Sequence, residues 1–212
     1  MELLIPVAGV AAVAWLIYAS KGSKTRTGPF EQVTRIDVPG LIGASSINKT
    51  ISMSTIPRTT GEQRVDNSIT SAELWLEGAN FRGKKLKSVP MGIALAAIIN
   101  ADYESRSSNF ATGDSGKSIG LYQIHERSRG SFSESELRTA TGNTLRMMEL
   151  YWSGRNARVE GAYQAGATVA ELAGLFGKYV EKTANPNALT LRADYARKLF
   201  PSIADLPGRA LT

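Results

Sequence analysis

Glu104 is the residue of this chain whose type and surroundings best suit catalysis. It follows an apolar segment that includes Ile98, Ile99 and Tyr103, and a polar loop containing glycine comes after it. A carboxyl group at the edge of an apolar helix is partly desolvated, which raises its pKa and keeps it protonated nearer to neutral pH. Such a group can donate a proton to the leaving oxygen of a glycosidic bond, so we predict that Glu104 is a general acid.

A second carboxylate completes most glycoside-cleaving sites, either as the nucleophile or as a base. The candidates near Glu104 are Asp102, Asp114 and Glu126. Asp114 lies on the loop that follows Glu104, where it could position a water molecule for hydrolysis. The residues alone leave open whether any of the three takes part.

Three short segments follow one another in an order that is typical of one family. Glu104-Ser105 ends an apolar segment, Gly120-Leu121-Tyr122-Gln123-Ile124 comes after a loop, and Ala162-Tyr163-Gln164-Ala165-Gly166 lies further downstream. In these segments the chain resembles the soluble lytic transglycosylases and goose-type lysozymes, which cut the glycan of peptidoglycan. Tyr122 stands where that family has Met, and Gln164 stands where it has Asn. The resemblance leaves residues 1–68 unexplained.

The resemblance implies a reaction with a single catalytic carboxylate. Glu104 would protonate the leaving oxygen and then act as base while the C6 hydroxyl of the muramoyl sugar attacks C1 of the same sugar, which gives a 1,6-anhydro product. Tyr163 would place its hydroxyl near Glu104, and either Tyr179 or Tyr195 would supply a further aromatic ring. The substrate-binding residues implied in this way are Ser105, Ser118, Gly120, Leu121, Tyr122, Gln123, Tyr163 and Gln164.

The elements that must position these residues are predicted to be mainly α-helical. Thr70 or Ser71 can cap a short helix, and Pro90 fits the first turn of a longer helix that is apolar nearly all round and delivers Glu104 at its end. An all-round apolar helix is typical of a buried central element. Further helices are predicted over Glu134–Arg138, Asn143–Tyr151, Val159–Ala165, Val169–Val180 and Leu189–Phe200. We therefore expect a lysozyme-like domain over residues 69–212.

The N-terminus carries a membrane signal. No charged residue occurs from Leu3 to Ser20, a run close to the roughly 20 apolar residues that span a bilayer as a helix. Positive charge follows this run, at Lys21, Lys24 and Arg26, instead of preceding it. This order favours a transmembrane anchor over a cleaved signal peptide, with a buried core helix as the third alternative.

The flanking charges also predict an orientation. Lys and Arg residues stay on the cytoplasmic side of a membrane, where a wall-cutting domain of a cell would find no substrate. A protein in the virion membrane of a phage would instead meet the wall at infection, so this location is favoured over a bacterial inner membrane with a periplasmic domain. The anchor is assigned to residues 1–20, and a polar linker, with possible short strands, to residues 21–68.

Composition adds exclusions. The net charge of +6 favours polyanions without choosing among peptidoglycan, nucleic acid and anionic lipid. The absence of Cys excludes disulfides, thiolate chemistry and cysteine zinc sites. His125 is the single histidine, and residues 113–118 lack the first glycine of a phosphate-binding loop. We expect no cofactor, no metal and no nucleic-acid partner.

Two functions remain open. The first is a membrane-anchored peptidoglycan lytic transglycosylase that opens the wall locally during phage entry, with a hydrolytic lysozyme as its enzymatic variant. Its partners would be the glycan strands, the lipid membrane through residues 3–20, and other virion or envelope proteins. The second is a non-catalytic structural or glycan-binding protein of a virion or envelope complex.

Overall fold

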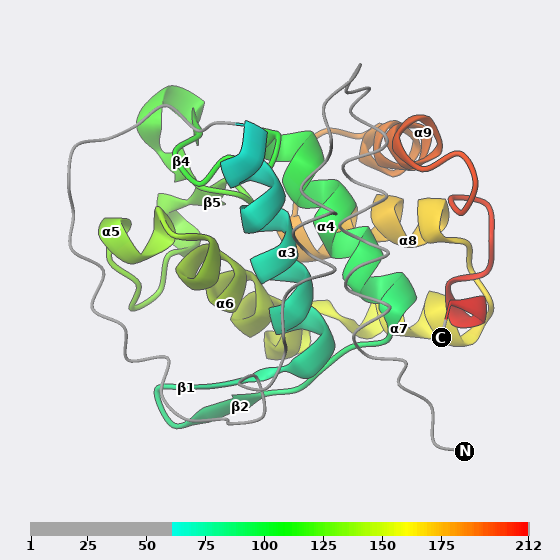
Figure 1. The fold of residues 1–212 in the computed structure, drawn as a ribbon, viewed down its shortest axis with the longest axis horizontal. Helices are drawn as coiled ribbons and strands as arrows, with labels where there is room; N and C mark the ends of the chain where they lie inside the picture. Colours follow the sequence, from blue (N-terminus) through cyan, green and yellow to red (C-terminus); the bar gives the residue numbers. More distant parts are fainter. Residues whose placement is uncertain (1–60, 212) are drawn as a thin grey trace.

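A computed structural model describes residues 61–211 of the chain (Figure 1). The predicted anchor at residues 1–20 and the linker up to residue 60 lie outside the described residues. Within 61–211, none of the helices has the length and apolar character needed to cross a bilayer.

The described part is mainly α, as predicted. Its helices are α3 (Gly61–Glu77), α4 (Met91–Ser105), α5 (Glu134–Leu137), α6 (Ala140–Leu150), α7 (Ala157–Gln164), α8 (Val169–Leu175) and α9 (Ala188–Leu199). Two π-helical segments, η3 (Tyr151–Arg155) and η4 (Phe176–Glu181), continue α6 and α8, and short 3-10 turns occur at η1 (Asp114–Gly116), η2 (Glu126–Ser128) and η5 (Gly208–Ala210). The helices predicted between residues 90 and 200 are thus confirmed, with shifts of a few residues at their ends.

Two small antiparallel sheets complete this part of the chain. β1 (Ala79–Phe81) pairs with β2 (Lys84–Leu86) in a hairpin between α3 and α4. β3 (Thr112–Gly113), β4 (Ser118–Ile119) and β5 (Ile124–His125) form a three-stranded sheet in the order β3-β4-β5. This second sheet holds the segment that follows Glu104.

Helix α3 begins at Gly61, inside the range predicted as linker, and Thr70 and Ser71 lie within this helix instead of capping it. The polar residues Asn67 and Ser68 lie on its buried face. Asn67 Nδ2 donates to the carbonyl of Ser107 at 2.9 Å, and Ser68 Oγ donates to Ser107 Oγ at 2.8 Å. A buried face made of hydrogen-bonding side chains shows no apolar period, so the start of the helix was not visible in the sequence.

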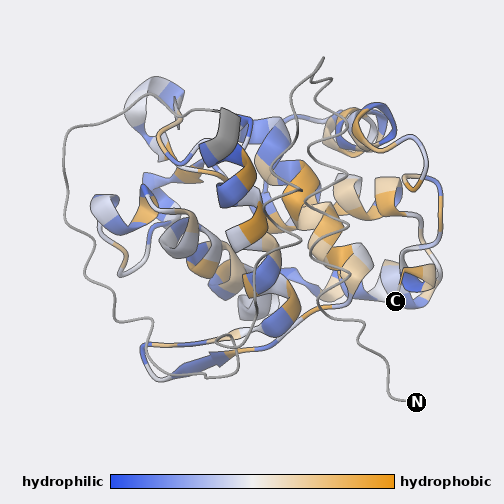
Figure 2. Cartoon of the chain, in the orientation of Figure 1, coloured by the Kyte–Doolittle hydropathy of each residue, from blue (hydrophilic) through white to orange (hydrophobic). Residues whose placement is uncertain are grey.

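Helix α4 is the centre of the core. Every residue from Gly92 to Asp102 is buried, which agrees with the prediction of a central helix. Figure 1 shows α4 between α3 and α8, and Figure 2 shows it coloured as hydrophobic along most of its length. Three aromatic rings also pack together in the core. The centroid of the Trp75 ring lies 5.4 Å from that of Tyr151 and 5.7 Å from that of Phe176, and both pairs are edge-on.

Candidate active site

The chain turns sharply directly after Glu104 and Ser105. Arg106 and Ser107 both have a φ of +56°, in the left-handed region. Ser105 stabilises the turn: its Oγ donates to the carbonyl of Ala101 at 3.0 Å and accepts from the backbone N–H of Ser108 at 3.1 Å. Ser105 therefore holds the loop beside Glu104 through local backbone hydrogen bonds.

Tyr195, from α9, lies at this same end of α4. Its hydroxyl donates to Asp102 Oδ2 at 2.6 Å, and its ring meets that of Tyr103 edge-on at 5.1 Å. Tyr179 instead is partly exposed and lies 5.8 Å from the guanidinium of Arg158. Of the two aromatic candidates, Tyr195 is thus the one that contacts the neighbours of Glu104.

Glu104 forms an ion pair that the sequence did not predict. Arg192, from α9, is 4% exposed and donates from Nη2 to Glu104 Oε1. The same nitrogen lies 3.3 Å from Glu181 Oε2, and Arg192 Nε donates to Asn100 Oδ1 at 2.8 Å. The guanidinium carbon also lies 3.7 Å from the centre of the Tyr103 ring. We call Glu104, Glu181 and Arg192 the carboxylate cluster.

The cluster holds two carboxyl groups around one guanidinium. Burial raises the pKa of Glu104, the charge and hydrogen bond of Arg192 oppose this, and the charge of Asp114 adds to it. Burial, followed by the charge of Glu104, raises the pKa of Glu181 to about 8. Because one cation cannot neutralise two carboxylates, the cluster retains one proton near neutral pH.

Glu181 is therefore expected to make the fold less stable as pH rises. Its pKa is near 8 in the folded chain against an ordinary value of 4.5, so the folded state binds the proton more tightly. The stabilisation is complete below pH 4.5 and is lost as pH rises through 8, with a slope of at most about 1.4 kcal/mol per pH unit. Urea unfolding at several pH values measures this slope.

The matched variants for this measurement are Glu181→Gln and Glu126→Gln. Glu181→Gln keeps an acceptor for Arg192 but removes the titration, so the slope between pH 5 and pH 8 flattens. Glu126 is exposed on η2, so its replacement leaves the slope unchanged. Equal slopes in the wild-type chain and in Glu181→Gln would contradict the raised pKa.

The three-stranded sheet brings Asp114 into the electrostatic range of Glu104. Ser118 is buried on β4, and its Oγ donates to Asp114 Oδ2 at 2.5 Å. Among the three candidates for a second carboxylate, Asp114 is the one whose charge raises the pKa of Glu104. Asp102 accepts hydrogen bonds from Ser107 and Tyr195 instead.

The side chains of the predicted Gly-Leu-Tyr-Gln segment differ in their placement. Leu121 and Tyr122 are buried in the core, as are Ser118 and Gly120, so these four predicted substrate-binding residues present almost no surface to a sugar. The Tyr122 hydroxyl lies 2.8 Å from Ser71 Oγ and accepts from Trp75 Nε1 at 2.9 Å. Gln123 is half-buried, and its Nε2 donates to the carbonyl of Gly120 at 2.8 Å.

Asn143, on α6, fixes the backbone of this segment and was missed in the sequence. It is fully buried. Its Nδ2 donates to the carbonyls of Ile119 and Leu137 at 3.0 and 2.8 Å, and its Oδ1 accepts from the N–H of Tyr122 at 2.9 Å. The side-chain amide of Asn143 thus forms hydrogen bonds with three buried backbone groups. Replacing Asn143 would remove these partners.

Gly120→Ala is expected to destabilise the fold by about 3 kcal/mol or more, because strain and overlap add. Gly120 has a φ of +79°, and a Cβ there would overlap the side chain of Asn143 and the carbonyl of Leu137. Gly116 is the matched control, since its φ is +89° but a Cβ there meets no atom within 4 Å. We expect Gly116→Ala to cost only about 1–2 kcal/mol. Equal losses in urea unfolding would contradict a close-contact role of Gly120.

The Ala-Tyr-Gln-Ala-Gly segment does not lie where the resemblance implies. A ring carbon of Tyr163 lies 3.4 Å from the position that a Cβ of Gly208 would occupy, and Gly208 packs against Gly92 at the start of α4. The helix between Gly92 and Glu104 spans about 18 Å at 1.5 Å per residue. Tyr163 thus packs near the start of α4, at the opposite end from Glu104. Figure 1 shows α7 beside one end of α4. Gln164 is exposed at the end of α7.

Within the described part of the chain, no group of three or more His, Asp or Glu side chains lies close enough together to hold a metal ion. No family model, no curated protein and no solved structure matches the chain.

Proposed function

We propose that the chain is a peptidoglycan lytic transglycosylase that cleaves the β-1,4 bond between N-acetylmuramic acid and N-acetylglucosamine. The observation that supports this most directly is Glu104, a carboxyl group with a raised pKa at the end of a buried helix. Its side chain is 25% exposed, so a substrate can still reach it. A carboxyl group with a raised pKa that a substrate can reach suits the role of a general acid.

In the proposed reaction Glu104 acts twice. Its proton passes to the glycosidic oxygen as the bond from C1 to that oxygen breaks. The C6 hydroxyl of the muramoyl sugar then attacks C1, and Glu104 takes up the hydroxyl proton, which restores the carboxyl group. The product is a 1,6-anhydro sugar, and no water is consumed.

The carboxylate cluster can control whether this acid is available. Catalysis requires the retained proton to be on Glu104, while Arg192 pairs with an ionised Glu181. The opposite arrangement, with the proton on Glu181, leaves Glu104 as a carboxylate paired with Arg192. Between the two steps the guanidinium would stabilise the carboxylate that Glu104 becomes when it has given its proton to the leaving oxygen.

Digestion of purified peptidoglycan by the full chain in mild detergent tests the proposal, with mass spectrometry of the released fragments. Anhydro-muramoyl ends would support the transglycosylase. Reducing ends would instead indicate a hydrolytic lysozyme, in which Asp114, whose charge acts on Glu104, would be the candidate for positioning water.

A non-catalytic structural or glycan-binding role is the second candidate. It is favoured by the ion pair between Arg192 and Glu104, which opposes protonation of the acid, and by the distance of Tyr163 from Glu104. Absence of products from a folded chain that still binds glycan would support this role.

The location in a phage virion membrane remains part of the proposal. Its basis is the uncharged run from Leu3 to Ser20 and the positive charges behind it. Protease treatment of intact host membranes that contain the chain tests the orientation. A C-terminal domain that is digested from the periplasmic side would favour the bacterial inner membrane instead.

A further inference from the structure

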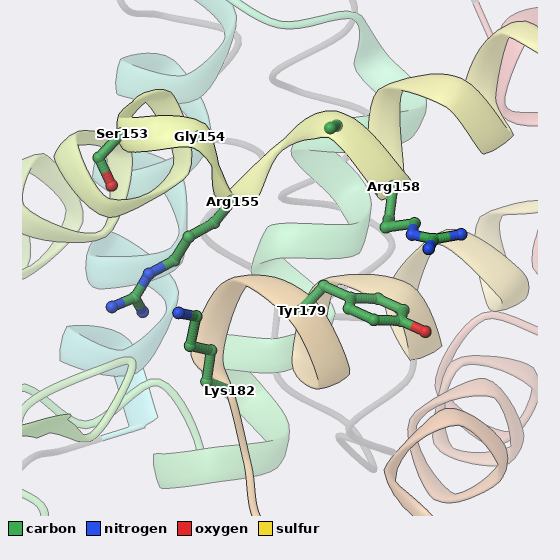
Figure 3. A pocket seen from close by; sticks show the side chains of 7 residues that line it. Ser153, Gly154, Arg155, Arg158, Tyr179 and Lys182 are labelled. Carbon is green, nitrogen blue, oxygen red and sulfur yellow. The ribbon is translucent and has the colours of Figure 1, made fainter.

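A pocket of about 470 Å³ lies apart from the carboxylate cluster, where η3, the start of α7 and the end of η4 meet (Figure 3). Its walls include Arg155, Ala157, Arg158, Tyr179 and Lys182. Its volume is within the range of about 300–1,000 Å³ that is usual for small-molecule sites. It is also larger than a single phosphate or carboxylate group requires.

The pocket concentrates positive charge without a matching acid. No acidic residue lines it, and Arg155, Arg158 and Lys182 form no ion pair within residues 61–211. Several arginines elsewhere have carboxylate partners, whereas Arg127 and Arg209, like the pocket arginines, form no ion pair within residues 61–211. Arg129 and Arg138 pair with the same glutamate of α5, and Arg146, Arg82 and Arg197 also have carboxylate partners. Cations that the fold leaves unpaired in a pocket are available to an anionic ligand.

Two further features suit an anion. Ala157 is the first residue of α7, and the side chain of the preceding Asn156 makes no capping hydrogen bond to this helix. The first N–H groups of a helix carry partial positive charge and favour anions. Arg155 Nη1 donates to the carbonyl of Val180 at 2.8 Å, which anchors its guanidinium beside η4.

The charges are spread along the pocket. Figure 3 shows Arg155 and Lys182 on one side, Arg158 on the other, and the ring of Tyr179 on the side of Arg158. Tyr179 is 37% exposed and lies 5.8 Å from the Arg158 guanidinium. This spacing fits a ligand with two separated anionic groups and an apolar stretch between them better than a compact phosphate.

We infer that this pocket binds the carboxylates of an acidic peptide, namely the peptide stem of the peptidoglycan strand. The inference rests on the proposed function, because the stem is attached to the muramoyl sugar. η4 links the two places, since Tyr179 lines the pocket while Glu181 contacts Arg192 in the carboxylate cluster. Stem binding at Tyr179 would therefore hold the substrate against the segment that carries one member of the cluster.

Calorimetric titration of the full chain with a synthetic stem peptide tests the inference, with the same peptide amidated at every carboxyl as the comparison. We expect the free peptide to bind and the amidated one to bind at least ten-fold more weakly. Arg158→Gln and Lys182→Gln each remove a charged contact and are expected to weaken binding about ten-fold. Arg127→Gln and Lys85→Gln remove exposed charges outside the pocket and are expected to leave it unchanged.

Several results would overturn the inference. Equal binding of the amidated peptide, or equal effects of pocket and control variants, would exclude carboxylate recognition here. Inorganic phosphate or vesicles of anionic lipid that bind more tightly than the peptide would reassign the pocket to phosphate groups. Absence of peptide binding at millimolar concentration would also refute it.

The inference and the proposed function can fail separately. Binding is measured with free peptide, so it is expected to persist in Glu104→Gln. Stem binding without glycan cleavage would leave the pocket assignment standing and remove the enzyme. Cleavage without stem binding would support the proposed enzyme and refute the pocket assignment.

Discussion

Glu104→Gln is expected to reduce glycan cleavage by on the order of a thousand-fold or more, because one group supplies both the acid and the base. Gln has the same shape and can still accept from Arg192, but it has no proton to donate to the leaving oxygen. The rate of release of anhydro-muramoyl fragments from purified peptidoglycan measures the effect. Glu104 is within reach of substrate and lies in a buried cluster, so the loss of rate must be separated from a loss of fold.

Glu126→Gln is the control for this change. Glu126 is an exposed carboxylate on the segment that follows β5, outside the carboxylate cluster. We expect it to retain full activity, and we expect both variants to unfold cooperatively in urea. Substantial cleavage by a folded Glu104→Gln chain would refute the single-carboxylate mechanism.

Arg192→Met is expected to give the largest loss of stability, about 3–5 kcal/mol, since removing one partner of a buried ion pair leaves uncompensated charge. Met keeps much of the apolar length of the side chain. It leaves Glu104 and Glu181 facing each other without a cation, and it removes the donor to Asn100 Oδ1. Urea unfolding at pH 7 followed by circular dichroism measures the loss.

Arg197→Met is the matched control on the same helix. Arg197 also pairs with two carboxylates, Asp194 and Asp205, but its side chain is 46% exposed. Exposed ion pairs contribute at most about 1 kcal/mol, so we expect a small effect. Adding Glu181→Gln to Arg192→Met is expected to recover part of the lost stability, because it removes one of the two titratable carboxyl groups left without a cation. If Arg192→Met and Arg197→Met lower the free energy of unfolding by the same amount, burial does not determine how much the ion pairs of Arg192 contribute to stability.

The sequence predicted the helices whose burial is mainly apolar. α4 was recognised because its residues are apolar on all sides, and α9 because Pro201 follows its expected end. The start of α3 was missed because Asn67 and Ser68 are buried through hydrogen bonds, which apolar periodicity does not register.

The site was predictable only for the part that is local in sequence. Glu104 and Ser105 were found from their position at the end of an apolar run. Arg192 lies 88 residues away, and its signal was subtle: it shares a helical face with the buried Ala188 and Ala196. A cation on such a face needs an acidic partner, but the sequence does not say which one.

Tyr163 shows a different limit. Its order in the chain agreed with the resemblance, but order along the sequence does not decide which end of a long helix a later segment packs against. The small residues Gly92 and Gly208 permit close backbone approach at the start of α4, and this contact draws η5 and Tyr163 to that end.

The burial of α4 on all sides also determines how the two halves of the site fluctuate. Amide hydrogens of an element buried all round exchange with solvent mainly when the whole domain unfolds, whereas partly exposed elements open locally. Glu104 is carried by the first kind of element. Arg192 is carried by α9, where Leu189 and Leu191 remain exposed. We therefore expect local opening at this site to displace the guanidinium of Arg192 and to leave Glu104 in place, which would transiently free Glu104 from its ion pair.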